Sequence, residues 1–230
     1  MPEPPPTPRW FRDAARAVGD ELAAYLGATW AMIRRPGRFV LGWWHGREPR
    51  PNPVGMMATG AAITAATREV TSAVIGLDHA SSFWAGVASA LGPYLHYVLV
   101  GLLCHLALLG LGRRRPRPRP GDTVAVALYA GAGPSAVAAA LAWLALLALH
   151  PWLDPAVVMP VALGVAFSVF CMALASTLGA LHDAPVWAIL VAFAVAFPVS
   201  GAIFGVAPAG DYGMHWVLRL DHGLALSLGL

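Results

Sequence analysis

The sequence predicts an all-α protein: a polytopic integral membrane helical bundle of five transmembrane helices, with an interfacial amphipathic helix at each end. Two observations predict this class. Of the 230 residues, 58% are hydrophobic and only 12% are charged, about half the charged share of an ordinary globular domain. The charged residues are also gathered into short segments, which leaves long stretches without any. A soluble protein needs a charged surface, and disorder needs low hydrophobicity, so both classes are excluded for most of the chain.

The N-terminal segment, residues 1–52, is predicted to be cytoplasmic and to contain an amphipathic helix. Apolar residues recur at helical spacing: Phe11, Ala14, Val18, Leu22, Tyr25, Leu26, Trp30 and Ile33. Arg12, Asp13, Arg16 and Asp20 lie on other faces. The pattern is typical of a helix that lies on a membrane surface.

Three arginines and two tryptophans follow this helix. Arg34, Arg35 and Arg38 precede Trp43 and Trp44, and tryptophan suits the membrane interface. The group is interpreted as a membrane anchor, or as a contact surface for a partner or for anionic lipid.

Five spans are predicted between residues 53 and 207. Four lie in charge-free windows, at about 84–110, 123–149, 156–180 and 185–207, each long enough for the roughly 20 residues that cross a bilayer. The first, at about 54–76, carries Arg68 and Glu69. It is predicted to cross fully, with a re-entrant hairpin as the alternative.

Arginine placement predicts the orientation. Eight Arg precede the first span and five lie in the Arg113–Arg119 loop, whereas the loops near 77–83 and 150–155 have none. The positive-inside rule therefore places the N-terminus in the cytoplasm and the C-terminal tail, residues 208–230, outside. All 15 basic residues are Arg and Lys is absent, a bias that suggests GC-rich coding and the plasma (inner) membrane of a bacterium. The arginine clusters are explained by topology, so no nucleic-acid partner is expected.

Four intramembrane polar residues are candidate functional residues: Arg68, Glu69, His96 and His105. Charges inside a span are costly and mark either an ion or substrate path or a structural contact between helices. Neighbours on a helix do not face each other, so Arg68 and Glu69 need not bridge themselves. His96 and His105 are nine residues apart, on opposite sides of their helix, and cannot hold one metal together.

The sequence carries no catalytic signature, and no cofactor, metal site or enzymatic activity is predicted. Cys104 and Cys171 lie in apolar stretches without metal-type spacing and are interpreted as packing residues. Gly131, Gly133, Pro134 and Ser135 interrupt the third span, which indicates tight helix packing or a broken helix that lines a site. Aspartate and histidine recur in segments expected outside the membrane, and a metal site there is a further alternative: Asp78, His79, His150, Asp154, Asp211, His215, Asp221 and His222.

Three segments carry a resemblance to a known family. They are "RRPGRFVLGWW" (Arg34–Trp44), "HLALLGLGRRRPRPRPGDTVAVALYAGAGP" (His105–Pro134, with Thr123 and Tyr129), and "GALHDAPVWAILVAF" (Gly179–Phe193). Between about Trp30 and Phe193 the chain resembles the bacterial branch of the Yip1 family. The resemblance implies five spans and a cytoplasmic N-terminus, and it brings no catalytic residues.

The predicted function is that of a non-enzymatic membrane scaffold or accessory subunit, with the lipid bilayer and other membrane subunits as partners. Two alternatives remain. One is the membrane anchor of a redox complex, with His96 or His105 near a haem or quinone. The other is a small transporter or channel that uses Arg68 and Glu69.

Overall fold

The structure is a computed structural model that describes residues 9–46, 52–75, 83–149, 152 and 155–204. Within these ranges every regular element is a helix, so the all-α prediction is confirmed there. The elements are α1 (Arg9–Arg34), α2 (Pro36–Trp44), α3 (Pro53–Ile75), α4 (Phe83–Leu108), α5 (Pro120–Ala130), the π-helical turn η1 (Gly131–Ser135), α6 (Ala136–Leu149), α7 (Pro155–His182) and α8 (Pro185–Phe204).

The five segments predicted as spans are all helices, with ends close to those expected from the sequence. Two stretches are long and apolar enough to cross a membrane by length and composition: Pro120–Leu149 and Gly164–His182. Tyr94–Leu108 and Pro185–Val199 are shorter apolar helices by the same measure. The predicted C-terminal interfacial helix, within 208–230, lies outside the described residues.

The N-terminal segment folds as two helices rather than one. Arg35 separates α1 from α2 with φ −147° and ψ 65°. Proline disfavours the α conformation of the residue before it, so Pro36 ends α1 and then begins α2.

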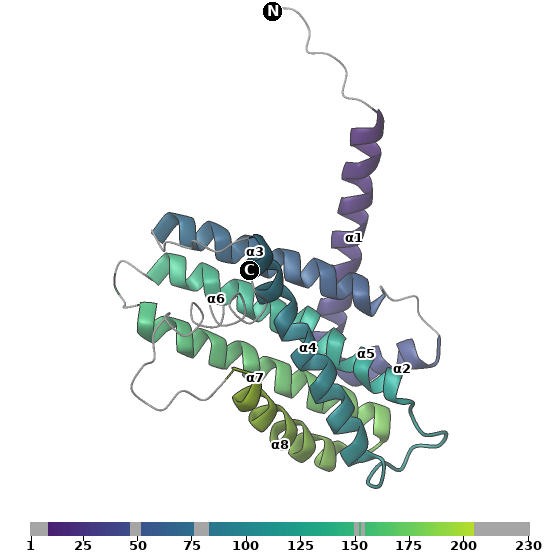
Figure 1. Cartoon of the computed structure of the whole chain (residues 1–230). Coiled ribbons are helices and arrows are strands. Elements are labelled where there is room, and N and C mark those ends of the chain that lie inside the picture. Colours follow the sequence, from purple (N-terminus) through teal and green to yellow (C-terminus); the bar gives the residue numbers. More distant parts are fainter. Residues whose placement is uncertain (1–8, 47–51, 76–82, 150–151, 153–154, 205–230) are drawn as a thin grey trace, which may run out of the picture.

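The bundle helices alternate in direction (Figure 1). The Thr71 hydroxyl donates to the Trp143 carbonyl and the Thr64 hydroxyl to that of Ala136, both 72 residues away. This constant offset means that α3 and α6 run parallel. In contrast, His105 pairs with Thr123 while Gly101 lies against Ala127, so α4 and α5 run antiparallel.

The turn η1 lies at the centre of the fold, and all five of its residues are buried. Pro134 has no N–H for the carbonyl four residues back, which disrupts the α-helical ladder. The N–H of Ala136 bonds to the carbonyls of Gly131 and Gly133, so it bypasses that of Ala132. A π-helical turn of this kind widens the helix without breaking it, and the third predicted span is therefore continuous and tightly packed.

The carbonyl of Ala132 accepts the hydroxyl of Tyr25 at 2.7 Å, which joins α1 to η1. Burial raises the pKa of Tyr25 to about 12, so the hydroxyl keeps its proton and donates. On the other side, a Cβ at Gly60 of α3 would lie 2.5 Å from the same carbonyl oxygen. Glycine is therefore required for α3 to approach this closely.

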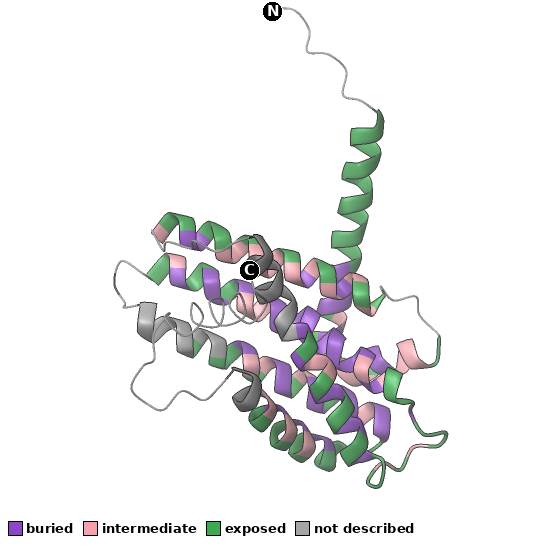
Figure 2. Ribbon diagram, viewed as in Figure 1, coloured by how far each residue is buried: buried purple, intermediate pink, exposed green. Residues whose placement is uncertain are grey.

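Helix α1 leaves the bundle across the direction of α3, α6 and α7 (Figure 1). Its buried residues are confined to its second half: Tyr25, Ala28, Thr29 and Met32. Every residue from Arg9 to Ala24 is exposed, and Figure 2 shows this outer half as continuously exposed ribbon.

We expect Gly131→Ala to destabilise the bundle. A Cβ at Gly131 would overlap the Tyr97 ring, and overpacking of a buried site costs about 1–3 kcal/mol. The measurement is the midpoint of thermal unfolding in detergent. Gly19→Ala is the matched control, because a Cβ there meets nothing within 4 Å. Equal midpoints for the two variants would contradict the packing at η1.

Candidate functional site

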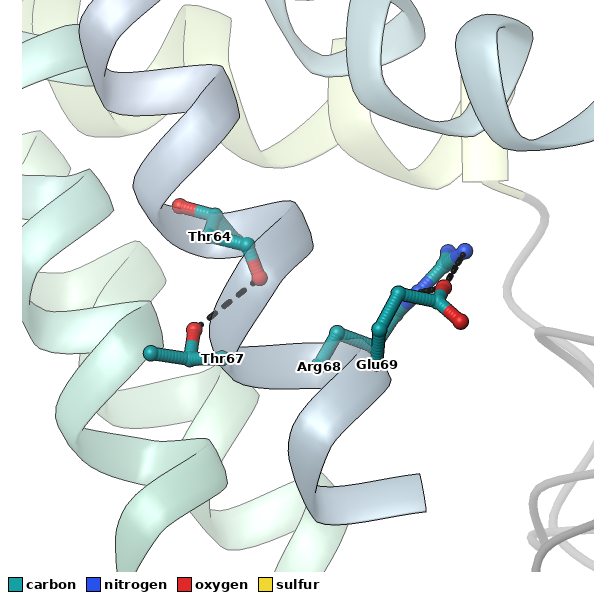
Figure 3. A network of polar contacts seen from close by, with 4 residues as sticks. All are labelled: Thr64, Thr67, Arg68 and Glu69. Atoms are coloured by element: carbon teal, nitrogen blue, oxygen red, sulfur yellow. Dashed lines mark hydrogen bonds and ion pairs between the residues drawn. The ribbon is translucent and has the colours of Figure 1, made fainter. Parts of the chain in front are cut away.

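Arg68 and Glu69 form an ion pair with each other on α3. The Nε and Nη2 of Arg68 donate to Oε1 of Glu69 at 3.2 and 2.8 Å. The sequence left open whether the pair bridges itself, and the structure shows that it does: both side chains are long enough to leave the helix before they meet (Figure 3). The Glu69 side chain is 57% exposed, whereas that of Arg68 is only 14% exposed, so the pair lies at the surface of the described bundle with Arg68 largely covered.

The threonines of α3 bond to backbone carbonyls. Thr64 and Thr67 donate to the carbonyls of Gly60 and Ile63 in their own helix, and Thr71 donates across to α6. Figure 3 shows Thr64 and Thr67 on a different side of the helix from the charged pair. The polarity of α3 therefore contributes to helix packing, and its charges lie apart from those contacts.

His96 is buried among aromatic rings. Its ring lies 5.3 Å from Tyr97 and 6.0 Å from Phe170, centre to centre. Tyr97 and Phe170 are themselves in contact, with ring centres 4.4 Å apart. Cys104 and Cys171 are buried free thiols. These residues form part of the packed interior of α4 and α7.

His105 belongs to a buried polar cluster that the sequence did not predict. Its Nδ1 lies 2.9 Å from the hydroxyl of Thr123, and the Nε2 of His182 lies 3.2 Å from the same hydroxyl. The two imidazole centres are 5.7 Å apart. The cluster therefore joins the end of α4, the start of α5 and the end of α7.

The chemistry of this cluster is that of a hydrogen-bond chain. A threonine hydroxyl donates one hydrogen and accepts up to two. Thr123 can therefore donate to one histidine and accept from the other, or accept from both. The facing nitrogens are occupied by this hydroxyl, so the pair does not present them to a metal or a haem.

Asp122 lies beside the cluster and caps α5. Its Oδ2 accepts the backbone N–H of Arg119 at 2.7 Å and the indole N–H of Trp44 at 3.3 Å. A carboxylate at a helix N-terminus also interacts favourably with the helix dipole. Trp44 thereby fixes α2 to the start of α5.

The Arg113–Arg119 loop covers the end of α7. The backbone N–H groups of Arg113 and Arg114 both donate to the carbonyl of His182, at 3.0 and 3.3 Å. The Arg114 Nη2 donates to the carbonyl of Ala180 at 2.9 Å, and its guanidinium lies over the Trp44 ring. These bonds satisfy carbonyls that a helix leaves free at its C-terminus. We refer to this region, residues 109–123 and 180–185, as the charged end of the bundle.

The predicted contact residues of the N-terminal segment divide into two groups. Arg34, Arg35 and Arg38 are exposed, and the Arg34 guanidinium lies over the Trp30 ring. Trp43 and Trp44 are half-buried, and Trp43 packs edge-on against Tyr129. The arginines remain open to a partner or to lipid, whereas the tryptophans hold α2 against the bundle.

Among the described residues, no group of three or more His, Cys, Asp or Glu side chains could hold a metal ion. The aspartates and histidines proposed from the sequence as an outer metal site lie outside those residues.

The chain matches no protein-family model, no curated protein and no solved structure. The Yip1-like assignment therefore stays a prediction.

We expect Thr123→Val to destabilise the junction of α4, α5 and α7. Valine keeps the shape but removes the hydroxyl between two buried imidazoles, and a buried polar group left without its partner costs about 1–3 kcal/mol. Thr123→Ser, which keeps the hydroxyl, should stay close to the wild type. The measurement is the thermal unfolding midpoint of each variant, and a midpoint for Thr123→Val as high as that of Thr123→Ser would contradict a stabilising role of the hydroxyl.

Proposed function

We propose that the chain is a five-span integral membrane protein of a bacterial plasma membrane, with a cytoplasmic N-terminus and an extracytoplasmic C-terminus. The alternating helix directions support five crossings. The outer faces of α4, α7 and α8 support contact with lipid, because they expose large apolar side chains: Leu95, Leu99, Leu102, Leu106, Val165, Met172, Ile189, Leu190, Phe193 and Phe197.

The charge distribution supports the same orientation. Five arginines of the Arg113–Arg119 loop lie at the charged end, which the positive-inside rule assigns to the cytoplasm. Helix α1 crosses the bundle direction (Figure 1), as an amphipathic helix in the plane of the membrane does.

Topology can be tested by labelling single cysteines in a Cys104→Ala, Cys171→Ala background. Gly110→Cys lies at the charged end, where a Cβ meets nothing within 4 Å, and Trp152→Cys replaces a residue that is 78% exposed. In intact cells, a membrane-impermeant maleimide should label Trp152→Cys, and it should label Gly110→Cys only after lysis. Labelling of both in intact cells would contradict the orientation.

Within this placement, we infer that the protein is a non-enzymatic scaffold or accessory subunit of a larger membrane complex. The observation that carries this inference is the outer half of α1, whose residues Arg9–Ala24 are all exposed. Its apolar face, which includes Val18 and Leu22, suits the leaflet. Its other faces carry both signs of charge, with Arg12 and Arg16 beside Asp13 and Asp20. A mixed-charge surface suits a protein partner better than a uniformly anionic lipid surface.

The interior of the described bundle supports this inference over the two alternatives. Its centre is filled by the packed residues of η1 and the rings around Tyr97. The Arg68–Glu69 pair closes on itself, and its Glu69 side chain is 57% exposed. The facing nitrogens of His105 and His182 are occupied by Thr123.

Native mass spectrometry after gentle extraction from the source membrane tests the accessory role. We expect reproducible masses of partner chains with the wild type. Arg16→Glu, which reverses one charge on the polar face of α1, should reduce their occupancy by at least several-fold, since like-charge contacts disfavour a partner. Gly19→Ala is the control and should retain the partners. A bare monomer, or a homo-oligomer with lipid alone, would overturn the inference.

A further inference from the structure

A small pocket lies at the charged end, between the Arg113–Arg119 loop and the ends of α4 and α7. The recess spans about 200 Å³, a figure that includes open solvent, and the cavity proper measures about 10 Å³. Arg114, Arg117 and His182 line it together with Leu109 and Pro118. Basic and apolar groups therefore share one small concave surface.

The charge of this pocket is unbalanced. Its lining carries two guanidinium groups and no carboxylate. The nearest carboxylate of the α5 start, Asp122, is already bonded to Arg119 and Trp44. The lining of the pocket therefore suits an anion.

Arg114 also has unused hydrogen-bonding capacity. Its Nη2 donates to Ala180, but its buried Nε has no hydrogen-bond partner among the described residues. A buried donor without a partner is costly. The Arg114 guanidinium also places positive charge at the pocket wall, and arginine is suited to phosphate recognition.

An apolar stripe on α4 leads away from the pocket. Leu95, Leu99, Leu102 and Leu106 are exposed and recur at helical spacing, so they lie on one face of the helix. Leu109 continues this face into the pocket lining. A charged pocket at the end of an apolar stripe matches the shape of a phospholipid, because the headgroup would lie in the pocket and the acyl chain along the stripe.

We propose that this pocket binds the phosphate of an anionic phospholipid, with an acyl chain along the leucine stripe of α4. This inference rests on the proposed membrane placement. Basic pockets between helices on the cytoplasmic side of a membrane are suited to such headgroups. Arg117 contributes charge from the exposed side of the pocket, while Arg114 is held in place by Ala180 and Trp44.

Native mass spectrometry of the full chain in detergent, titrated with dioleoyl phosphatidylglycerol or dioleoyl phosphatidylcholine, tests this proposal. We expect one phosphatidylglycerol per chain to be retained in preference to phosphatidylcholine. Arg117→Gln should weaken its retention about tenfold, the order expected for one charge-assisted hydrogen bond. Arg113→Gln is the matched control: it removes the same charge from the same loop, but Arg113 does not line the pocket.

Three results would overturn the proposal. Equal retention of the two lipids would remove the preference for an anionic headgroup. Equal weakening by Arg113→Gln and Arg117→Gln would indicate general surface charge. Displacement of the lipid by millimolar inorganic phosphate would indicate a site for a soluble phosphate instead. These failures leave the cysteine labelling result intact, so they are distinguishable from failure of the membrane placement.

Discussion

The carbonyl oxygen of Ala132 fixes three parts of the fold relative to one another. It accepts the Tyr25 hydroxyl of α1, and the absence of a side chain at Gly60 lets α3 pack directly against it. This arrangement depends on the π-helical turn at Pro134, in which the N–H of Ala136 bypasses Ala132. Ser135 of the same turn donates to the Ala166 carbonyl of α7. A local defect in one helix thus becomes the point at which α1, α3 and α7 converge.

The charged end shows a second use of freed backbone groups. The turn between α7 and α8 has no arginine of its own, so the positive-inside rule gives no direct signal for the orientation of the last two helices. The neighbouring loop supplies the missing charge, because Arg113 and Arg114 bond to the carbonyls at the end of α7. Positive charge near a helix C-terminus is also favoured by the helix dipole. The turn between α7 and α8, which has no arginine in the sequence, therefore has arginines beside it in the fold.

Hydropathy predicted the helices well, because a charge-free window of this length has few other solutions. It could not predict how the helices meet. Helices α4, α6, α7 and α8 are apolar on nearly every side, so the sequence marks no face of them as inward. The link from Tyr25 to Ala132 and the position of Arg114 depend on the register between helices. The proximity of the three residues in the His105 cluster could be predicted in part. His105, Thr123 and His182 all lie at ends of predicted spans that the arginine pattern places on one side. His105 alone was named as a candidate, since its partners looked like ordinary helix-end residues.

The exposed length of helix α1 limits how closely neighbouring membrane proteins can approach on that side. Its 26 residues correspond to about 39 Å, and the exposed stretch Arg9–Ala24 accounts for about 24 Å of that length. In the proposed membrane placement this stretch occupies area beside the bundle at the level of the leaflet. A neighbouring bundle on that side must keep its distance or pass beneath the helix. In this placement the described part of the protein therefore has an asymmetric footprint, with the side that carries α1 spaced from its neighbours.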